Sequence, residues 1–307
     1  MNHRTVTYCL MGVLVTLWGI EYVAAKYMLG FVEPMTLQFM KSAMGTLFLL
    51  PVILRQTQQP HQIPRLSPAA RLKDAGMVVL ATGIGIVLYF LCEYTAMDYL
   101  PVSAITLMLG ILPAMSIIVE RIVYGRKISA KLLLLVFASI AGIAIVIGGD
   151  FRVLLSGRLI GYVLSFGCVM CWTVYNFITE HMGAGSTPYT LAFRQLLYTS
   201  VMLLPYFILH FPEFGSFTLT ANIAMLFLGI VISGCGYIII VRTLTELGPS
   251  IEAMFVNLMP VSTTIFGWLL LGEMISPVQI LGGVIIIVAG FLAIREKARL
   301  QKSIQFK

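Results

Sequence analysis

Residues 18–51 read WGIEYVAAKYMLGFVEPMTLQFMKSAMGTLFLLP, and much of this pattern returns 154 positions later in residues 172–205, WTVYNFITEHMGAGSTPYTLAFRQLLYTSVMLLP. Leucine matches carry little weight in a chain that is 59% hydrophobic, but the chain holds only 3 Trp and 13 Pro. These rare residues align in one register: Trp18 with Trp172, Pro34 with Pro188, and Pro51 with Pro205. Further along, Pro113 aligns with Pro260 at a shift of 147. The pattern indicates a tandem duplication.

The composition is that of a membrane protein. The mean hydropathy is +0.95, and only 11% of the 307 residues are charged. A soluble protein needs more polar surface, so the solvent is expected to be largely lipid. The net charge of +7 comes from basic residues spread over short loops and the C-terminal tail. That spread argues against nucleic-acid binding and fits a membrane orientation signal.

Ten apolar stretches have about the 20 residues that a spanning helix needs. They are residues 6–27, 34–54, 75–97, 100–120, 131–149, 157–179, 188–210, 218–244, 249–271 and 277–294. The first is expected to stay as a span, because it lacks a convincing signal-peptide cleavage site. The connections are short, so we predict an all-α integral membrane protein with ten transmembrane helices and no soluble domain.

Basic residues predict the orientation. With the N-terminus in the cytoplasm, inside segments hold 15 of the 20 Lys and Arg, and outside segments hold only Lys26, Arg152 and Arg158. Lys41 and Arg194 fall within spans. This bias predicts a multi-pass protein of the cytoplasmic membrane with both termini cytoplasmic.

Five helices in each copy predict that the second copy enters the membrane inverted. The predicted repeats are residues 1–152 and 153–307. The duplicated corner supports this: Gly125 is followed by Arg126 and Lys127, whereas Gly272 is followed by Glu273 and Met274. A cytoplasmic corner favours cations and an external one does not. Inverted repeats recur in secondary transporters, which bind substrate between the halves.

Both copies place a Trp in the first helix, a Pro at the start of the second, and a Pro inside the fourth before a glycine corner. In this the chain resembles the EamA-type branch of the drug/metabolite transporter superfamily. The resemblance implies a five-plus-five fold and transport of small metabolites such as amino acids, often outward. One departure is that the family often has Arg after the aromatic residue of the second helix. Phe193-Arg194 keeps it, whereas the first copy reads Phe39-Met40-Lys41.

Ionisable residues inside spans are candidates for function because burying them in a membrane is costly. Glu21 and Lys41 lie at similar depth on neighbouring helices. They form an ion pair, or Lys41 holds a substrate carboxylate while Glu21 takes an amine or a proton. Glu93 shares a helical face with Tyr89. It belongs to the external mouth, carries a proton, or reaches the lipid headgroups.

Arg194 and Glu252 are candidates for a second gate, equivalent to Glu21 and Lys41 in the inverted copy, or for a tie between helices. Trp18 shares a helical face with Glu21, and Trp172, Tyr175 and Asn176 form an aromatic and amide stripe. Such stripes line cavities or pack helices together.

Pro113 and Pro260 each remove a backbone hydrogen bond and are candidate hinges, or simply tolerated kinks. Cys168 and Cys171 have redox or metal-ligand spacing, but no His or carboxylate accompanies them, so we expect packing residues. No Walker motif occurs and no cofactor is expected.

The predicted function is therefore secondary transport of a small molecule by alternating access, with export favoured and the proton a possible coupling ion. A membrane-embedded enzyme is disfavoured, because His3, His61, His181 and His210 form no evident catalytic cluster. A receptor that binds its ligand without moving it is a further alternative. The sequence leaves the substrate and any homo-oligomer undecided.

Overall fold

The computed structural model describes residues 3–57, 68–125, 129–147, 158–183 and 186–305. All regular secondary structure in those ranges is helical, in agreement with the predicted all-α class. The predicted boundary between the repeats, at residues 152 and 153, lies outside the described residues. So do five cations used for the orientation and one histidine: Arg65, Arg126, Lys127, Arg152, Lys307 and His61.

The described part of the first half follows the predicted order of helices. The elements are α1 (His3–Met28), α2 (Pro34–Thr57), α3 (Pro68–Thr82), the π-helix η1 (Gly83–Leu88), α4 (Tyr89–Ala96), α5 (Val102–Leu109), α6 (Leu112–Tyr124) and α7 (Ala130–Ile147). Helices α3, η1 and α4 form one continuous segment, and α5 and α6 form one segment with a break.

The second half repeats this order. Its elements are α9 (Arg158–Gly183), α10 (Pro188–Leu209), a short 3₁₀ turn η2 (Phe214–Ser216), α11 (Leu219–Leu226), the π-helix η3 (Phe227–Cys235), α12 (Gly236–Leu247), α13 (Pro249–Val256), α14 (Met259–Leu271) and α15 (Pro277–Gln305). Helix α10 begins as its sequence predicts, with Pro188 in the first turn and the Thr187 hydroxyl accepting a hydrogen bond from the backbone N–H of Thr190 at 3.2 Å.

Eight of the ten predicted spans are long and apolar enough to cross a membrane within the described residues. The other two, predicted at 131–149 and 277–294, are shorter apolar helices over residues 130–146 and 277–293. Helix α15 itself is 29 residues long, but its apolar part ends where Arg295, Glu296 and Lys297 begin. The structure therefore gives a multi-pass helical protein with eight candidate spans.

The third and fourth segments of the two halves share their irregularities. Both third segments contain a π-helix with two glycines. Both fourth segments break, at residues 110–111 and 257–258, and Pro113 and Pro260 lie in the first turn after the break. The two segments also end alike, at Gly125 and Gly272 with φ of 64° and 67°, the left-handed conformation that glycine adopts at helix ends. The prolines thus follow a break and do not kink a continuous helix.

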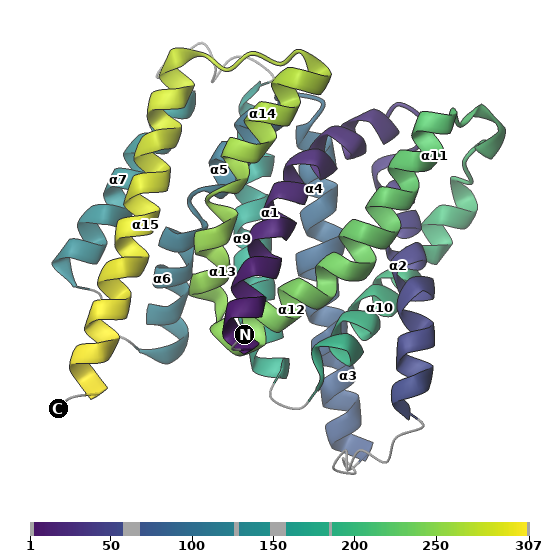
Figure 1. Ribbon diagram of the computed structural model, residues 1–307, viewed down its shortest axis with the longest axis horizontal. Coiled ribbons are helices and arrows are strands. Elements are labelled where there is room, and N and C mark those ends of the chain that lie inside the picture. The colour runs from purple at the N-terminus through teal and green to yellow at the C-terminus, as the bar shows by residue number, and fades with distance from the viewer. Residues whose placement is uncertain (1–2, 58–67, 126–128, 148–157, 184–185, 306–307) are drawn as a thin grey trace.

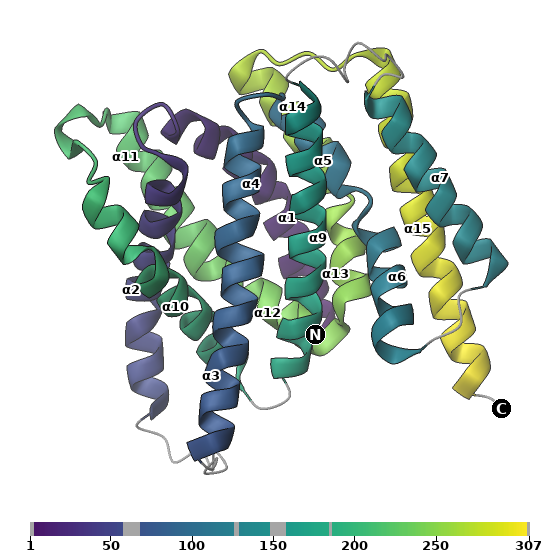
Figure 2. The ribbon, with the colours of Figure 1, turned by 180° about the vertical axis from the view of Figure 1, so that it is seen from behind.

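Helices of the first half pack against their counterparts in the second. Helix α2 lies along α10, and α7 lies along α15; Figures 1 and 2 show α7 and α15 side by side at one edge of the molecule. Helix α1 packs against α14. The two ends of the chain lie toward the same end of the helix bundle in both views (Figures 1 and 2).

Apolar side chains cover the outside of the bundle, and polar side chains occur inside it. Val13, Leu134 and Val201 are among the exposed apolar residues, whereas Lys41 and Glu93 are buried. This distribution suits a protein whose outer faces contact lipid, since polar groups in a membrane face the bundle interior. The interior is therefore where a functional site is expected.

Candidate functional site

Lys41 and Glu21 form a buried ion pair between α2 and α1. The Lys41 Nζ lies 2.5 Å from a Glu21 carboxylate oxygen and donates a second hydrogen bond to the Tyr94 hydroxyl at 2.8 Å. It also lies 4.3 Å from the centre of the Phe90 ring. An unpaired charge buried this deeply would be strongly destabilising. The pairing is one of the two interpretations that the sequence left open, and it places a primary ammonium group between a carboxylate and an aromatic face.

The same two positions of the second half carry a neutral pair. In the 154-residue register, Tyr175 corresponds to Glu21 and Gln195 to Lys41. The Tyr175 hydroxyl donates to Gln195 Oε1 at 2.9 Å, and Gln195 Nε2 donates to the Thr179 hydroxyl at 3.1 Å. Corresponding positions of α1–α2 and α9–α10 are thus joined by an ion pair in one half and by hydrogen bonds between uncharged groups in the other.

The predicted second gate between Arg194 and Glu252 does not form. Arg194 Nη2 lies 2.5 Å from a carboxylate oxygen of Asp74 on α3. Glu252 is fully buried and accepts hydrogen bonds from Trp172 Nε1 at 2.9 Å and from Asn176 Nδ2 at 2.7 Å. It lies in the first turn of α13, where free backbone N–H groups favour an anion. Arg194 thus ties α10 to α3, and Glu252 belongs to the polar network of α9.

Glu93 is also held by neutral donors. One carboxylate oxygen accepts a hydrogen bond from the Tyr22 hydroxyl and another from the Tyr89 hydroxyl, each at 2.5 Å. The two hydroxyl oxygens lie 3.3 Å apart. Only 3% of Glu93 is exposed, so the interpretation that it reaches the lipid headgroups is wrong. The predicted contact with Tyr89 on the same face of the helix is confirmed.

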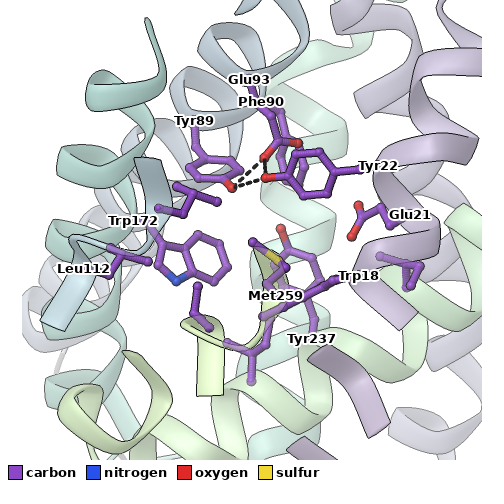
Figure 3. A pocket seen from close by; sticks show the side chains of 14 residues that line it. Trp18, Glu21, Tyr22, Tyr89, Phe90, Glu93, Leu112, Trp172, Tyr237 and Met259 are labelled. Carbon is purple, nitrogen blue, oxygen red and sulfur yellow. Dashed lines mark hydrogen bonds between the residues drawn. The ribbon is translucent and has the colours of Figure 1, made fainter. Parts of the chain in front are cut away.

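Aromatic rings connect these groups. The ring of Trp172 lies 5.1 Å from that of Tyr89 and 6.1 Å from that of Trp18, the latter in an edge-to-face arrangement. Such offset and edge-on contacts are the favoured geometries for ring pairs. Figure 3 shows Tyr22, Tyr89 and Glu93 together at the top of a central space, with Trp172 next to Tyr89 and with Trp18, Tyr237 and Met259 on the lower side.

The space they surround is a cavity of about 30 Å³. That volume admits about two water molecules, whereas small-molecule sites usually enclose at least about 300 Å³. The cavity is therefore too small to hold a metabolite. Binding a metabolite would require the surrounding helices to move apart.

The two halves line this cavity with corresponding positions. Trp18 and Trp172 correspond in the 154-residue register, and four further pairs correspond at a shift of 147: Phe90 with Tyr237, Glu93 with Ile240, Leu109 with Val256, and Leu112 with Met259. The corresponding positions nevertheless carry different chemical groups. Its two carboxylates, Glu21 and Glu93, both come from the first half.

The predicted site residues fall into three groups. Five of them line the cavity: Trp18, Glu21, Tyr89, Glu93 and Trp172. Four do not line it: Lys41 bonds to Glu21, Asn176 bonds to Glu252, Glu252 accepts from Trp172, and the ring of Tyr175 lies 5.1 Å from that of Trp172. Arg194 lies apart, on Asp74. Cys168 and Cys171 are both buried in α9, as packing residues would be.

Nine of the 14 lining residues were missed, and three of these are aromatic: Tyr22, Phe90 and Tyr237. Tyr22 lies one helical turn after Trp18, so the shared face was a usable signal. Phe90 and Tyr237 are corresponding positions of the duplication, which was a second signal.

The similarity of this chain to known proteins identifies its family. The sequence profile of the EamA-like transporter family matches residues 5–148 and 159–295, which is most of the chain. The chain belongs to the EamA-like transporter family. With its apolar helices, this identifies a multi-pass membrane transporter. Because its relatives are named as transporters, the comparison also favours transport over catalysis.

Two relatives of this EamA-like protein show how far the similarity reaches. It is 22% identical over 305 residues to the uncharacterized transporter YvbV of Bacillus subtilis, covering 98% of this chain and 95% of that one. It is 23% identical over 231 residues to a probable terminal-alkyne amino-acid exporter of Streptantibioticus cattleyicolor, covering 74% and 75%. A solved crystal structure that is 17% identical matches the fold with a TM-score of 0.65, over 94% of this chain and 97% of that one.

Proposed function

We propose that this EamA-family protein is a secondary transporter that exports small metabolites, amino acids among them, through the central cavity by alternating access. The cavity is the observation that carries the proposal. It lies buried in a multi-pass membrane protein, is lined from both halves, and presents two carboxylates and six aromatic rings. Charged groups inside a membrane are costly and typically belong to a substrate or ion pathway.

We assign residues 1–152 and 153–307 to two five-helix repeats of opposite topology in the cytoplasmic membrane. In this assignment the shorter apolar helices α7 and α15 complete a set of ten spans. Each of the two ranges matched by the family profile, residues 5–148 and 159–295, falls within one proposed repeat, which supports the assignment. The excess of Lys and Arg in alternate loops supports cytoplasmic termini.

We assign substrate contact to Trp18, Glu21, Tyr89, Glu93 and Trp172. These residues face one cavity (Figure 3). Lys41 and Glu252 position Glu21 and Trp172 through hydrogen bonds, Asn176 supports Glu252, and the Tyr175 ring packs against Trp172. The apolar rings suit the body of an amphipathic molecule, and the carboxylates suit a polar group or a coupling proton.

The proposed movement depends on the breaks in the fourth segments, which makes Pro113 and Pro260 hinge residues. Leu109 and Leu112 flank one break and Val256 and Met259 flank the other, and all four line the cavity. Bending at either break would therefore change the cavity directly.

The two ends of α1 are tied to the second half. Lys26 pairs with Glu273 at 2.8 Å near one end, and the Thr7 hydroxyl donates to Glu246 at 2.7 Å near the other. Access to the cavity from one side would break one of these contacts while the other is kept. The name of the Streptantibioticus relative, an amino-acid exporter, supports the outward direction.

Exchange in proteoliposomes tests the proposal. A panel of toxic amino acids, nucleosides and cations is first screened for resistance conferred by expression, and a labelled member is then used in counterflow with purified protein. We expect counterflow by the wild type and loss of it in Leu112→Trp, which fills the cavity. Leu134→Trp adds the same ring on an exposed face of α7 and should retain it. Binding without exchange for every compound would instead indicate a receptor and overturn the proposal.

A further inference from the structure

Glu93 is a buried carboxylate without a cation. Its hydrogen-bond donors are the hydroxyls of Tyr22 and Tyr89, and within the described residues no Lys, Arg or His lies at ion-pair distance from it. Glu21, in contrast, is matched by Lys41. When Glu93 is ionised, the lining of the cavity therefore carries one negative charge that no neighbouring side chain pairs.

The protein already shows how it holds an ammonium group at this depth. Lys41 Nζ lies against the Glu21 carboxylate, the Tyr94 hydroxyl and the face of the Phe90 ring. Glu93 has similar neighbours: it accepts from the hydroxyls of Tyr22 and Tyr89, and the ring of Tyr89 lies 5.1 Å from that of Trp172, which lines the same cavity. Aromatic faces attract cations, most strongly where water is excluded.

The hydroxyl of Tyr237 is a buried polar group of the cavity without a hydrogen-bond partner in the described part of the chain. Tyr237 is only 4% exposed, and its side chain reaches into the space that Glu93 and the two tryptophans line (Figure 3). Buried polar atoms are nearly always paired, so this hydroxyl is available to the polar group of a ligand that displaces water from the cavity.

Cations that could receive a ligand carboxylate are already occupied. Lys41 is held by Glu21 and Tyr94 and does not line the cavity. Arg194 is held by Asp74, away from the cavity. A carboxylate brought into the cavity would be desolvated without a partner, which is strongly unfavourable.

We propose that the cavity recognises an organic cation: a primary amine with an apolar, preferably aromatic body. The ammonium group donates to Glu93 and to the oxygen of Tyr237, and the body packs against Trp18 and Trp172. This deepens the proposed transport function and rests on it. It also ranks ligands: a plain amine binds better than the corresponding amino acid, and the corresponding acid binds worst.

Three compounds with the same phenyl-alkyl body test the ranking: 2-phenylethylamine, phenylalanine and 3-phenylpropionate. Binding to the purified full-length protein is measured by isothermal titration calorimetry. We expect the amine to bind at least tenfold more tightly than phenylalanine, and phenylpropionate to bind more weakly still. Glu93→Gln should weaken amine binding at least tenfold. Glu213→Gln removes an exposed carboxylate outside the cavity and should leave it unchanged.

Tyr237→Phe keeps the proposal testable if Glu93→Gln does not fold. It removes a hydroxyl that has no partner in the described structure, so the fold should tolerate it, and amine binding should fall several-fold. Tighter binding of either carboxylate-bearing compound, binding of none of the three, or amine binding unaffected in the folded variants would overturn the proposal.

Counterflow with the same compounds separates the two claims. Exchange of phenylpropionate in preference to the amine would remove the cation site and leave transport standing. Amine binding that depends on Glu93, without exchange of the amine, would support the cation site and contradict transport.

Discussion

Removing the cation of the buried ion pair between Lys41 and Glu21 should strongly destabilise the protein. At the observed 2.5 Å, the gross attraction between Lys41 and Glu21 is about 7 kcal/mol at an effective dielectric constant of about 20. Desolvation of both ions offsets most of it, but removal of one partner of a buried pair typically costs about 3–5 kcal/mol.

The variant Lys41→Gln leaves the Glu21 carboxylate buried without its cation. We therefore expect Lys41→Gln to lose about 3–5 kcal/mol of unfolding free energy.

The second half supplies a neutral replacement for the pair. Tyr175 and Gln195 occupy the corresponding positions and bond at 2.9 Å. A long side chain faces a short one in both pairs, so Glu21→Tyr combined with Lys41→Gln should recover about 2 kcal/mol or more of the loss, as coupled neighbours can.

The assay is equilibrium unfolding in mixed micelles for the wild type, both single variants and the double variant. A loss in Lys41→Gln of less than about 1 kcal/mol, the value of an exposed pair, would refute the argument from the stranded carboxylate. A double variant whose loss equals the sum of the single losses would refute the claimed equivalence of the two pairs.

Two further predictions concern packing and the ends of the helices. Gly85→Ala should lose about 1–3 kcal/mol of unfolding free energy, because a Cβ there meets the side chain of Tyr175, whereas Gly76→Ala, which has open space around it, should not; equal stabilities would show that α9 does not need this close approach. The hydrogen bond from Lys131 at 2.8 Å lowers the pKa of Glu296. The ion pair that joins α7 to α15 is therefore fully formed above the ordinary carboxyl pKa of about 4.3, and it is lost only as the pH falls through the lowered pKa. Lys131→Met should therefore leave the pH profile of transport between about pH 5 and 8 unchanged, and a shift of that profile in the flux assay would contradict this account.

Much of the fold could be predicted because lipid imposes a simple rule on sequence. Each predicted stretch of about 20 apolar residues forms helix over most of its described residues, with breaks at 110–111 and 257–258. The register of rare Trp and Pro residues also predicted which helices correspond. The π-helices could not be predicted, because a widened turn leaves no distinct pattern in a uniformly apolar run such as residues 227–235.

The site was predictable where its contacts are local and not where they join distant helices. Tyr89 and Glu93 are one turn apart, so helical spacing alone predicted their contact. The bond from Tyr22 to the same carboxylate joins α1 to α4, and no periodicity in one chain specifies which helices meet. Arg194 shows the same limit: its partner Asp74 falls just before the predicted span 75–97, whereas it lies within α3.

The side from which the cavity opens tests the central claim most directly, and the measurement needs no known substrate. Met259 lines the cavity and is 3% exposed. In a background whose five native cysteines are replaced, Met259→Cys is treated with a small membrane-impermeant thiol reagent, added to right-side-out or inside-out vesicles. Alternating access predicts modification from both sides, whereas modification from one side only, or from neither, would contradict it.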